Sequence, residues 1–141
     1  PRPFDALYAK DVMSTDLFTV NEEESMALTE RIMHWRTIRH LPVENSRGEL
    51  VGLLTRKQIE EWSENATEPF EKLHDDMVKD PISASPYTPL SDVLDLMQTH
   101  QIGCIPIVVD KHIVGMITDT DMKRVLGTDE LPATGVEKGV A

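Results

Sequence analysis

The sequence contains two copies of one pattern, and this internal repeat restricts the possible folds more than any other feature. At a shift of 64 residues several apolar positions coincide, in the pairs Met13/Met77, Met33/Met97, Ile38/Ile102 and Pro42/Pro106. After the turn that reads "NSRGE" in one copy and "DKH" in the other, the shift becomes 63 and Gly52 matches Gly115. Since a surface turn tolerates such a deletion, we expect one structural unit to be built twice.

The second copy shows the clearer secondary structure. In "PLSDVLDLMQTH" the apolar residues recur at the spacing of one helical face, which predicts an amphipathic helix over 89–100 that begins at the proline. The runs "CIPIVV" and "IVGMIT" are rich in β-branched residues and predict a hairpin of two largely buried strands. A short helix over 119–126 follows.

The first copy repeats this order less clearly. Its first helix is expected to be lined by Met26, Leu28, Ile32, Met33 and Trp35. The strands "LPVEN" and "LVGLLT" and a helix "RKQIEEWS" come next. Each unit is therefore β-α-β-β-α after an extended segment ("LFTV" or "PISA"), and the fold class is α+β. Because neither half could bury both its sheet and its helices alone, we expect the halves to pack sheet to sheet.

The predicted domain boundaries follow the two copies. Repeat 1 spans 8–63 and repeat 2 spans 74–127, with a Glu-rich linker over 64–73 and a loosely held C-terminal tail over 128–141. The chain begins at Pro1 without an initiator methionine, which is compatible with a piece excised from a larger protein.

Charge and cysteine content exclude several classes of function. The net charge of −11 repels a phosphodiester backbone, so we expect no nucleic-acid partner. Cys104 is the single cysteine, which excludes a disulfide framework and multi-cysteine zinc sites and favours the cytoplasm. The histidines lack the spacing of metal ligands, and no apolar run approaches the ~20 residues that span a bilayer. We therefore expect neither a metal site nor membrane insertion.

The motifs together resemble a tandem pair of cystathionine-β-synthase (CBS) domains, also called a Bateman module. Each copy has an extended start, a helix, an apolar-Pro-apolar strand ("LPV" or "IPI") and a glycine-containing strand that turns into a helix, over about residues 8–127. The resemblance implies a pseudo-two-fold module with two clefts that commonly bind AMP, ADP, ATP or S-adenosylmethionine. It also implies homodimers formed through the helices and a regulatory role beside enzyme, channel or transporter domains.

The turn Thr118-x-x-Asp121 has two interpretations. One is a capping box at a helix N-terminus, a pattern that Thr55-x-x-Gln58 in the first copy satisfies equally. The other is a ribose site, because two carboxylate oxygens accept hydrogen bonds from two adjacent hydroxyls and a neutral amide does so less well. The family resemblance implies this second role for Asp121 and leaves Gln58 as a cap.

The other candidate residues follow from the resemblance. Adenine is expected between the extended start of the second copy and its first hairpin strand, in a set made of Ile82, Ser83, Ala84, Cys104, Ile105 and Pro106. For the apolar members of this set, core packing is the alternative role. Pseudo-symmetry brings Arg39 and His40 toward the ligand phosphates, where an Arg provides bidentate hydrogen bonds; a solvated strand end is the alternative. Lys123 and Arg124 are expected to lie on a solvated helix face.

These features predict one working adenine-nucleotide site and one degenerate site. The first cleft lacks the aspartate, and its cross-copy positions carry no charge. We expect a non-enzymatic cytoplasmic sensor whose regulatory ligand is AMP, ADP or ATP, with or without Mg²⁺, or S-adenosylmethionine, and which controls an attached or partner protein. The alternative is a ligand-free dimerisation or docking module that uses the helix faces around Met26, Met33, Met97 and Trp62.

Overall fold

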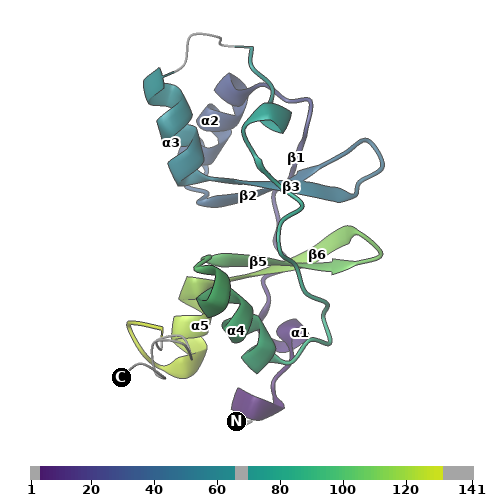
Figure 1. The fold of residues 1–141 in the computed structure, drawn as a ribbon, viewed down its shortest axis with the longest axis vertical. Helices are drawn as coiled ribbons and strands as arrows, with labels where there is room; N and C mark the ends of the chain where they lie inside the picture. Colours follow the sequence, from purple (N-terminus) through teal and green to yellow (C-terminus); the bar gives the residue numbers. More distant parts are fainter. Residues whose placement is uncertain (1–3, 66–69, 132–141) are drawn as a thin grey trace. The chain divides into compact units, whose positions relative to one another are not determined.

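The two copies of the repeat exchange their leading segments, which are residues 4–17 of the first copy and residues 72–81 of the second copy. The computed structural model describes residues 4–65 and 70–131, and the chain divides into two compact units. Of the described residues, 18–65 with 70–81 form the first-copy unit, and 4–17 with 82–131 form the second-copy unit (Figure 1). Residues 4–17 therefore pack with the second copy although they stand at the start of the first copy in the sequence.

The first-copy unit is a four-stranded sheet with helices. Its elements are β1 (Val20–Asn21), α2 (Met26–Trp35), β2 (His40–Glu44), β3 (Leu50–Thr55), α3 (Arg56–Asn65), a 3-10 helix (Leu73–Asp75) and β4 (Val78–Lys79). The strand order is β1-β2-β3-β4; β1 runs parallel to β2, and the other pairs are antiparallel. Helices α2 and α3 lie on one side of the sheet (Figure 1).

The second-copy unit has the same layout with its outer strands reduced to single bridges. Its elements are a 3-10 helix (Phe4–Ala6), α1 (Ala9–Val12), α4 (Leu90–His100), β5 (Cys104–Val109), β6 (His112–Thr118) and α5 (Asp119–Leu126). Strands β5 and β6 form an antiparallel hairpin. Ala84 bridges Ile107 in parallel and Ser14 bridges Met116 in antiparallel fashion, in the places that β1 and β4 occupy in the first-copy unit. The predicted α+β class is confirmed.

A methionine of each exchanged segment covers a hairpin glycine. A Cβ added at Gly115 would lie 2.8 Å from Cγ of Met13, and a Cβ added at Gly52 would lie 2.9 Å from Cγ of Met77. Such distances are much shorter than a normal carbon–carbon contact. Glycine at these two positions therefore lets the exchanged segment pack directly on the hairpin.

The compact units divide the chain differently from the repeat boundaries expected at 8–63 and 74–127. Those boundaries mark copies in the sequence, whereas the units include the exchanged segments. Within the expected linker, Leu73 is fully buried in the core of the first-copy unit, and residues 66–69 lie outside the described residues. In the expected tail, Leu131 packs against the core of the second-copy unit, and residues 132–141 lie outside the described residues.

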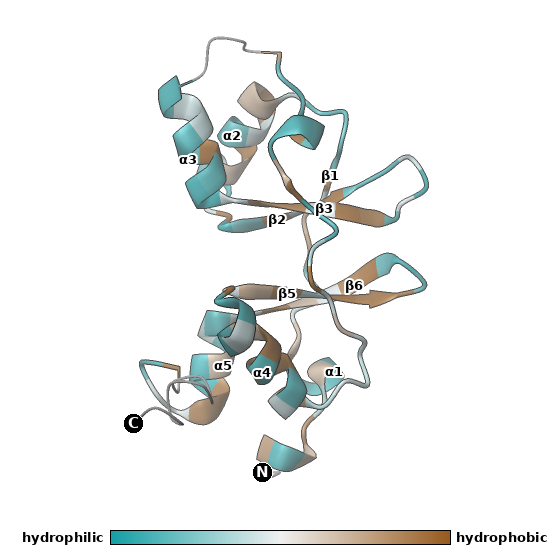
Figure 2. Cartoon of the chain, in the orientation of Figure 1, coloured by the Kyte–Doolittle hydropathy of each residue, from teal (hydrophilic) through white to brown (hydrophobic). Residues whose placement is uncertain are grey.

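The core of the second-copy unit contains the predicted face of α4. All four apolar residues of that face are buried, namely Leu90, Val93, Leu94 and Met97. They pack with strand residues such as Ile105 and Ile117, which are also buried. The predicted amphipathic helix is therefore confirmed, and its apolar side faces the β5–β6 hairpin (Figure 2).

The predicted face of α2 is partly wrong. Met26, Thr29 and Met33 are buried, but Leu28 is 44% exposed and Trp35 is 83% exposed. At about 100° per residue, Leu28 and Trp35 lie on the side of the helix opposite Met26. The helix begins after Ser25, whose Oγ accepts a hydrogen bond from the Leu28 N–H at 3.2 Å.

The docking face expected around three methionines is also wrong. Met26, Met33 and Met97 are buried inside their own units, and Trp62 is half-buried against the core of the first-copy unit. These side chains are already packed, so they leave little surface for a partner. None of the helices within residues 4–65 and 70–131 combines the length and the apolar character that a membrane span requires.

The close packing of Gly115 against Met13 predicts a specific coupling. Gly115→Ala should lower the free energy of unfolding by about 1–3 kcal/mol, because the new methyl overpacks the hairpin. Part of this loss should disappear in the background Met13→Ala, where the obstructing side chain is gone. Denaturant unfolding of the two single variants and the double variant measures the coupling.

Met77→Ala is the matched control, since Met77 covers Gly52 in the other unit. Its effect should add to that of Gly115→Ala. Equal coupling to Met13 and Met77 would contradict the exchanged packing.

Candidate functional site

A capping box connects β6 to α5 in the second-copy unit. The carboxylate oxygen Oδ2 of Asp121 accepts hydrogen bonds from the Thr118 N–H at 2.8 Å and from the Thr118 hydroxyl at 3.1 Å. In return Thr118 Oγ1 accepts from the Asp121 N–H at 3.4 Å. These reciprocal hydrogen bonds fix both side chains at the helix N-terminus.

The first-copy unit builds the same box with an amide. Gln58 Oε1 accepts from the Thr55 N–H at 2.8 Å and from the Thr55 hydroxyl at 3.3 Å, and the Gln58 N–H donates to Thr55 Oγ1 at 3.2 Å. The geometry of the cap therefore does not require a carboxylate. Capping explains Thr118, but it does not explain why position 121 is Asp.

Cys104 lies beside this turn. It pairs with Thr118 across the β5–β6 hairpin and is buried. Burial, followed by the negative charges of Asp121 and Asp119, raises the pKa of the Cys104 thiol to about 12. The thiol is therefore a neutral group near physiological pH, and an ionised nucleophile is not available at this position.

The predicted adenine-binding set belongs to one unit and lies along β5. The Ala84 N–H donates to the Pro106 carbonyl at 3.0 Å, and the Ala84 carbonyl accepts from the Val108 N–H at 2.8 Å. These backbone groups of Ala84 are therefore already used. Ser83, its neighbour, is exposed.

The apolar members of the set contribute to the core. Ile105 is fully buried, and Ile82 and Ala84 are half-buried against the same cluster. Pro106 is also buried. Core packing therefore accounts for Ile105, and a ligand role for the set is a separate prediction.

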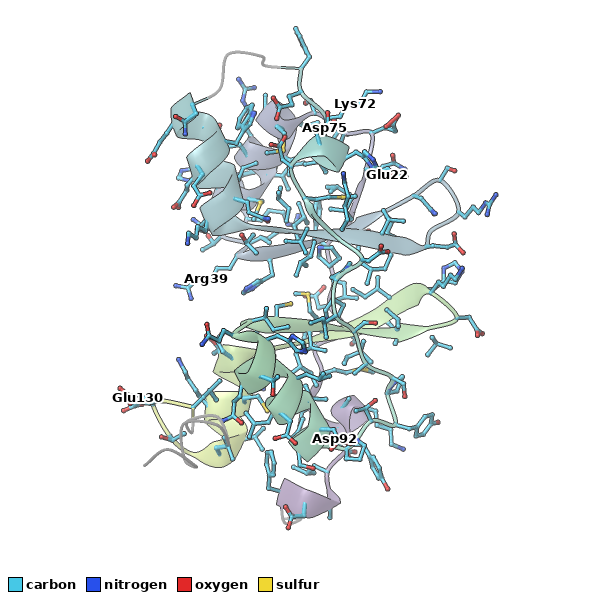
Figure 3. The ribbon with its side chains drawn as sticks, viewed as in Figure 1. Glu22, Arg39, Lys72, Asp75, Asp92 and Glu130 are labelled. Carbon is cyan, nitrogen blue, oxygen red and sulfur yellow. The ribbon has the colours of Figure 1, made fainter. Side chains whose placement is uncertain are left out.

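Arg39 and His40 stand at the start of β2, in the first-copy unit. Arg39 is exposed, and Figure 3 shows its side chain extending away from the strand. Its carbonyl accepts a hydrogen bond from the Arg56 N–H at 2.9 Å. His40 is half-buried as the first residue of the strand. Because both residues belong to the other unit, their approach to an Asp121 ligand stays a prediction.

The sequence analysis missed the partner of Asp121 on α5. Arg124 Nη2 donates to Asp121 Oδ1 at 3.0 Å; the Arg124 side chain is 64% exposed and that of Asp121 is 14% exposed. On the same helix, Lys123 Nζ lies 3.9 Å from Asp119 Oδ2. The i,i+3 and i,i+4 spacings of these pairs are visible in the sequence and are the signal that could have identified them.

Four positions of the helix after the turn differ in charge between the two copies, and at three of them the sign is reversed. The corresponding pairs, second copy first, are Asp119/Arg56, Asp121/Gln58, Lys123/Glu60 and Arg124/Glu61. In α5 acids precede bases, which is the favourable order for the helix dipole. In α3 a base precedes acids, and Arg56 instead caps carbonyl groups, donating to the Ile38 oxygen at 3.0 Å.

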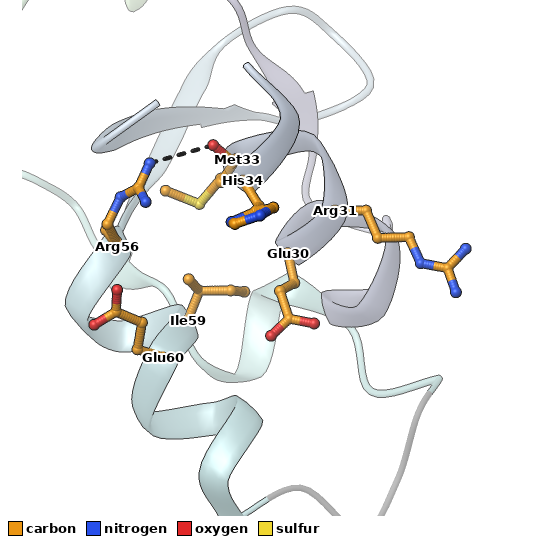
Figure 4. A pocket seen from close by; sticks show the side chains of 7 residues that line it. All are labelled: Glu30, Arg31, Met33, His34, Arg56, Ile59 and Glu60. Atoms are coloured by element: carbon orange, nitrogen blue, oxygen red, sulfur yellow. Dashed lines mark hydrogen bonds between the residues drawn. The ribbon is translucent and has the colours of Figure 1, made fainter. Parts of the chain in front are cut away.

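A pocket of about 320 Å³ lies in the first-copy unit between α2 and α3 (Figure 4). Met33 and Ile59 supply its apolar surface, and the remaining lining residues are charged or polar: Glu30, Arg31, His34, Arg56 and Glu60. The pocket contains no residue of the predicted site, and its acids offset its arginines. We do not assign the nucleotide to it, because it offers no surplus of positive charge to a phosphate.

Across residues 4–65 and 70–131, no three His, Cys, Asp or Glu side chains are grouped so that they could hold a metal ion.

Comparison with known proteins assigns the fold and the repeat. Two similar α+β units in one chain define a tandem-repeat module, and the sequence model of the CBS domain matches residues 9–65 and 72–128. The chain belongs to the CBS domain family. The tandem CBS pair expected from the motifs is thereby confirmed, and such a pair is generally a regulatory module rather than a catalytic one.

Solved structures agree with this assignment. An uncharacterized conserved protein from Pyrococcus horikoshii has 26% sequence identity and a TM-score of 0.78, over 94% of this chain and 100% of that chain. The CBS domain pair of protein MJ0100, in complex with 5′-methylthioadenosine and S-adenosyl-L-methionine, has 26% identity and a TM-score of 0.77, over 86% of this chain and 96% of that chain.

Several curated relatives are longer proteins. Homoserine O-acetyltransferase from Methanohalobium evestigatum is 30% identical over 120 residues, which is 84% of this chain and 24% of that protein. The chain spans about a quarter of the length of the transferase relatives that it matches.

The raised pKa of Cys104 predicts slow alkylation. At pH 8 iodoacetamide should modify the folded chain at least a hundredfold more slowly than the unfolded chain, because a shift from 9.0 to about 12 lowers the thiolate fraction about a thousandfold. Mass spectrometry with and without guanidinium chloride measures the two rates.

The same shift has a pH dependence. The pKa of the thiol is higher in the folded chain than in the unfolded chain. The free energy of unfolding therefore keeps its full value below pH 9 and decreases as the pH rises toward 12. Cys104→Ala should remove that decrease. Fast alkylation of a chain that remains folded by circular dichroism would contradict the buried thiol.

Proposed function

We propose that the chain is a sensor that binds one adenosine-containing ligand at Asp121 and regulates an attached or partner protein. The ligand class is AMP, ADP, ATP or S-adenosylmethionine, with Mg²⁺ as a bridge for the longer phosphates. In this proposal Asp121 accepts from the ribose hydroxyls, with Thr118 holding its carboxylate. The second copy provides the working site, and the cleft of the first copy is degenerate.

The observation that carries the proposal is the difference between two otherwise equal capping boxes. Gln58 satisfies the cap in one unit with the same hydrogen bonds that Asp121 makes in the other. A second carboxylate oxygen is thus not needed for the cap. It is needed to accept hydrogen bonds from a vicinal diol, and a ribose presents such a diol.

The comparison with MJ0100 supports the ligand class. That CBS domain pair was solved with two compounds, 5′-methylthioadenosine and S-adenosyl-L-methionine, and both contain an adenosine group. The shared adenine and ribose favour a site built around the base and the diol. The group attached to the ribose 5′ carbon is then the variable part of the ligand.

Arg39 and His40 are proposed to receive the phosphates. Arg39 is exposed and carries a planar guanidinium group suited to bidentate phosphate contacts. A local cation is necessary because the whole chain has a net charge of −11 and repels anions. Adenine would lie against the segment with Ser83 and the strand with Cys104, on apolar surface.

Regulation requires that the ligand bind one conformation better than another. A coupling of about 1–3 kcal/mol is typical of such control. We propose a homodimer formed through the helices, a cytoplasmic location and a regulated protein or domain outside this chain. The docking alternative now has a different surface from the one expected, since Leu28 and Trp35 are the exposed apolar residues of α2.

Asp121→Gln tests the ribose role, because it copies the cap of the first copy into the second. The variant should keep its melting temperature and lose about tenfold or more in affinity for adenosine compounds, because a charge-assisted hydrogen bond is removed. Isothermal titration with AMP, ADP, ATP and S-adenosylmethionine measures the affinities.

Gln58→Ala is the control for the cap itself, since it removes the corresponding interaction in the first copy. It should lower stability by about 1 kcal/mol and leave affinity unchanged. Equal affinity of Asp121→Gln and the parent chain would refute the site. A flat titration with every compound would instead favour the docking module.

Arg39→Ala tests the phosphate role. Its affinity for AMP should decrease about tenfold, whereas its affinity for adenosine should not change, because only AMP carries the phosphate. Arg47→Ala, in the hairpin turn of the same unit, is a control for the loss of one exposed positive charge. If both ligands weaken equally, Arg39 does not act on the phosphate.

A further inference from the structure

We propose that Arg124 competes with the ligand ribose for the carboxylate of Asp121, so that it sets the affinity of the site and makes that affinity sensitive to salt. This inference rests on the proposed function, because it concerns the same carboxylate. The inference goes beyond the proposed function, because it assigns a role to a residue outside the predicted ligand-binding set. The pair formed by Arg124 Nη2 and Asp121 Oδ1, 3.0 Å apart, is its starting point.

The acceptor sites of Asp121 are nearly all in use. Oδ2 already accepts two hydrogen bonds from Thr118, at 2.8 and 3.1 Å. Since a carboxylate oxygen has two lone pairs, Oδ2 is occupied by the cap. Oδ1 accepts from Arg124 and has one further lone pair. A vicinal diol donates two hydrogen bonds, so both of its hydroxyls reach Oδ1 only when Arg124 leaves.

Arg124 is placed so that it can leave at little cost. Its side chain is 64% exposed, so solvent replaces the lost hydrogen bond, whereas Asp121 is only 14% exposed and is held by the cap. Exposed ion pairs contribute little to stability and are screened by salt. The arginine therefore moves and the carboxylate stays, as a displaceable competitor requires.

The first copy supports the link between the two residues. Where the second copy has Asp121 and Arg124, the first copy has Gln58 and Glu61. The carboxylate and its arginine are thus present together in one unit and absent together in the other. A cap alone would not require the arginine, because Gln58 completes the same box beside a glutamate.

The competition predicts a salt effect for uncharged ligands. Adenosine and 5′-methylthioadenosine have a ribose diol and no net charge, so their own attraction to the protein is little affected by ions. Raising the salt concentration to about 1 M shortens the Debye length to about 3 Å and weakens the pair between Arg124 and Asp121. The affinity of the parent chain for these ligands should rise as its competitor is screened.

The experiment compares the parent chain, Arg124→Gln and Lys123→Gln by titration with adenosine and 5′-methylthioadenosine at low and high salt. Lys123 is the matched control, since it is a neighbouring cation on α5 that pairs with Asp119 instead. At low salt Arg124→Gln should bind both ligands about two- to fivefold more tightly than the parent chain. At high salt the two affinities should converge, and Lys123→Gln should match the parent chain throughout.

Each other outcome has a separate meaning. If Arg124→Gln binds equally or more weakly at low salt while Asp121→Gln still weakens binding about tenfold or more, the competition is wrong and the proposed site stands. If the ratio of affinities does not depend on salt, Arg124 acts through the structure of the helix, and the competition is again wrong. If neither ligand nor AMP binds in a way that depends on Asp121, the proposed function fails and this inference fails with it.

A ligand control separates the diol from the base. 2′,3′-Dideoxyadenosine keeps the adenine but lacks both hydroxyls, so its affinity should be the same for the parent chain and Arg124→Gln. A gain equal to that for adenosine would show that Arg124 does not act on the ribose, and it would overturn the inference.

Discussion

The hydrogen bonds between Thr118 and Asp121 are the interaction on which the candidate site depends. They begin α5, they hold a carboxylate at the end of β6, and they leave its other oxygen to accept from Arg124. A helix N-terminus also presents free N–H groups and a positive dipole end, which stabilises this half-buried carboxylate. The same turn thus serves folding and the proposed binding. In the first copy the amide of Gln58 completes the cap, so the cap alone does not require a carboxylate.

The exchange of leading segments explains why the two copies occur together. Ser14 bridges Met116 and Met13 covers Gly115, so the hairpin of the second copy is completed by residues from the start of the first copy. The segment with Met77 does the same for the first copy. Each unit therefore depends on chain that belongs, by sequence, to the other repeat, and a single repeat cut at its sequence boundary would lose part of its own core.

The chain belongs to the CBS domain family, and a pair of CBS domains is generally a regulatory module. The chain spans about a quarter of the length of the transferase relatives that it matches, and the regulated protein or domain belongs to the proposal. Its own residues argue for ligand recognition rather than chemistry. The one thiol is neutral and buried, and the carboxylate beside it is engaged by a cap and an arginine. Binding at such a site would change charge pairs on α5, which is a local event that a partner could detect.

The sequence by itself determined the repeated element order, the apolar face of α4 and the two capping turns, because these depend on spacing within a few residues. Tertiary structure decided the rest. The buried side of α2 depends on where the helix meets its sheet, so Leu28 and Trp35 could not be placed from periodicity alone. The pairing of Arg124 with Asp121 was allowed by its spacing but not required, because an exposed ion pair is little more stable than a solvated arginine. The partners of the leading segments depend on contacts between residues far apart in the chain, and local sequence carries no information about them.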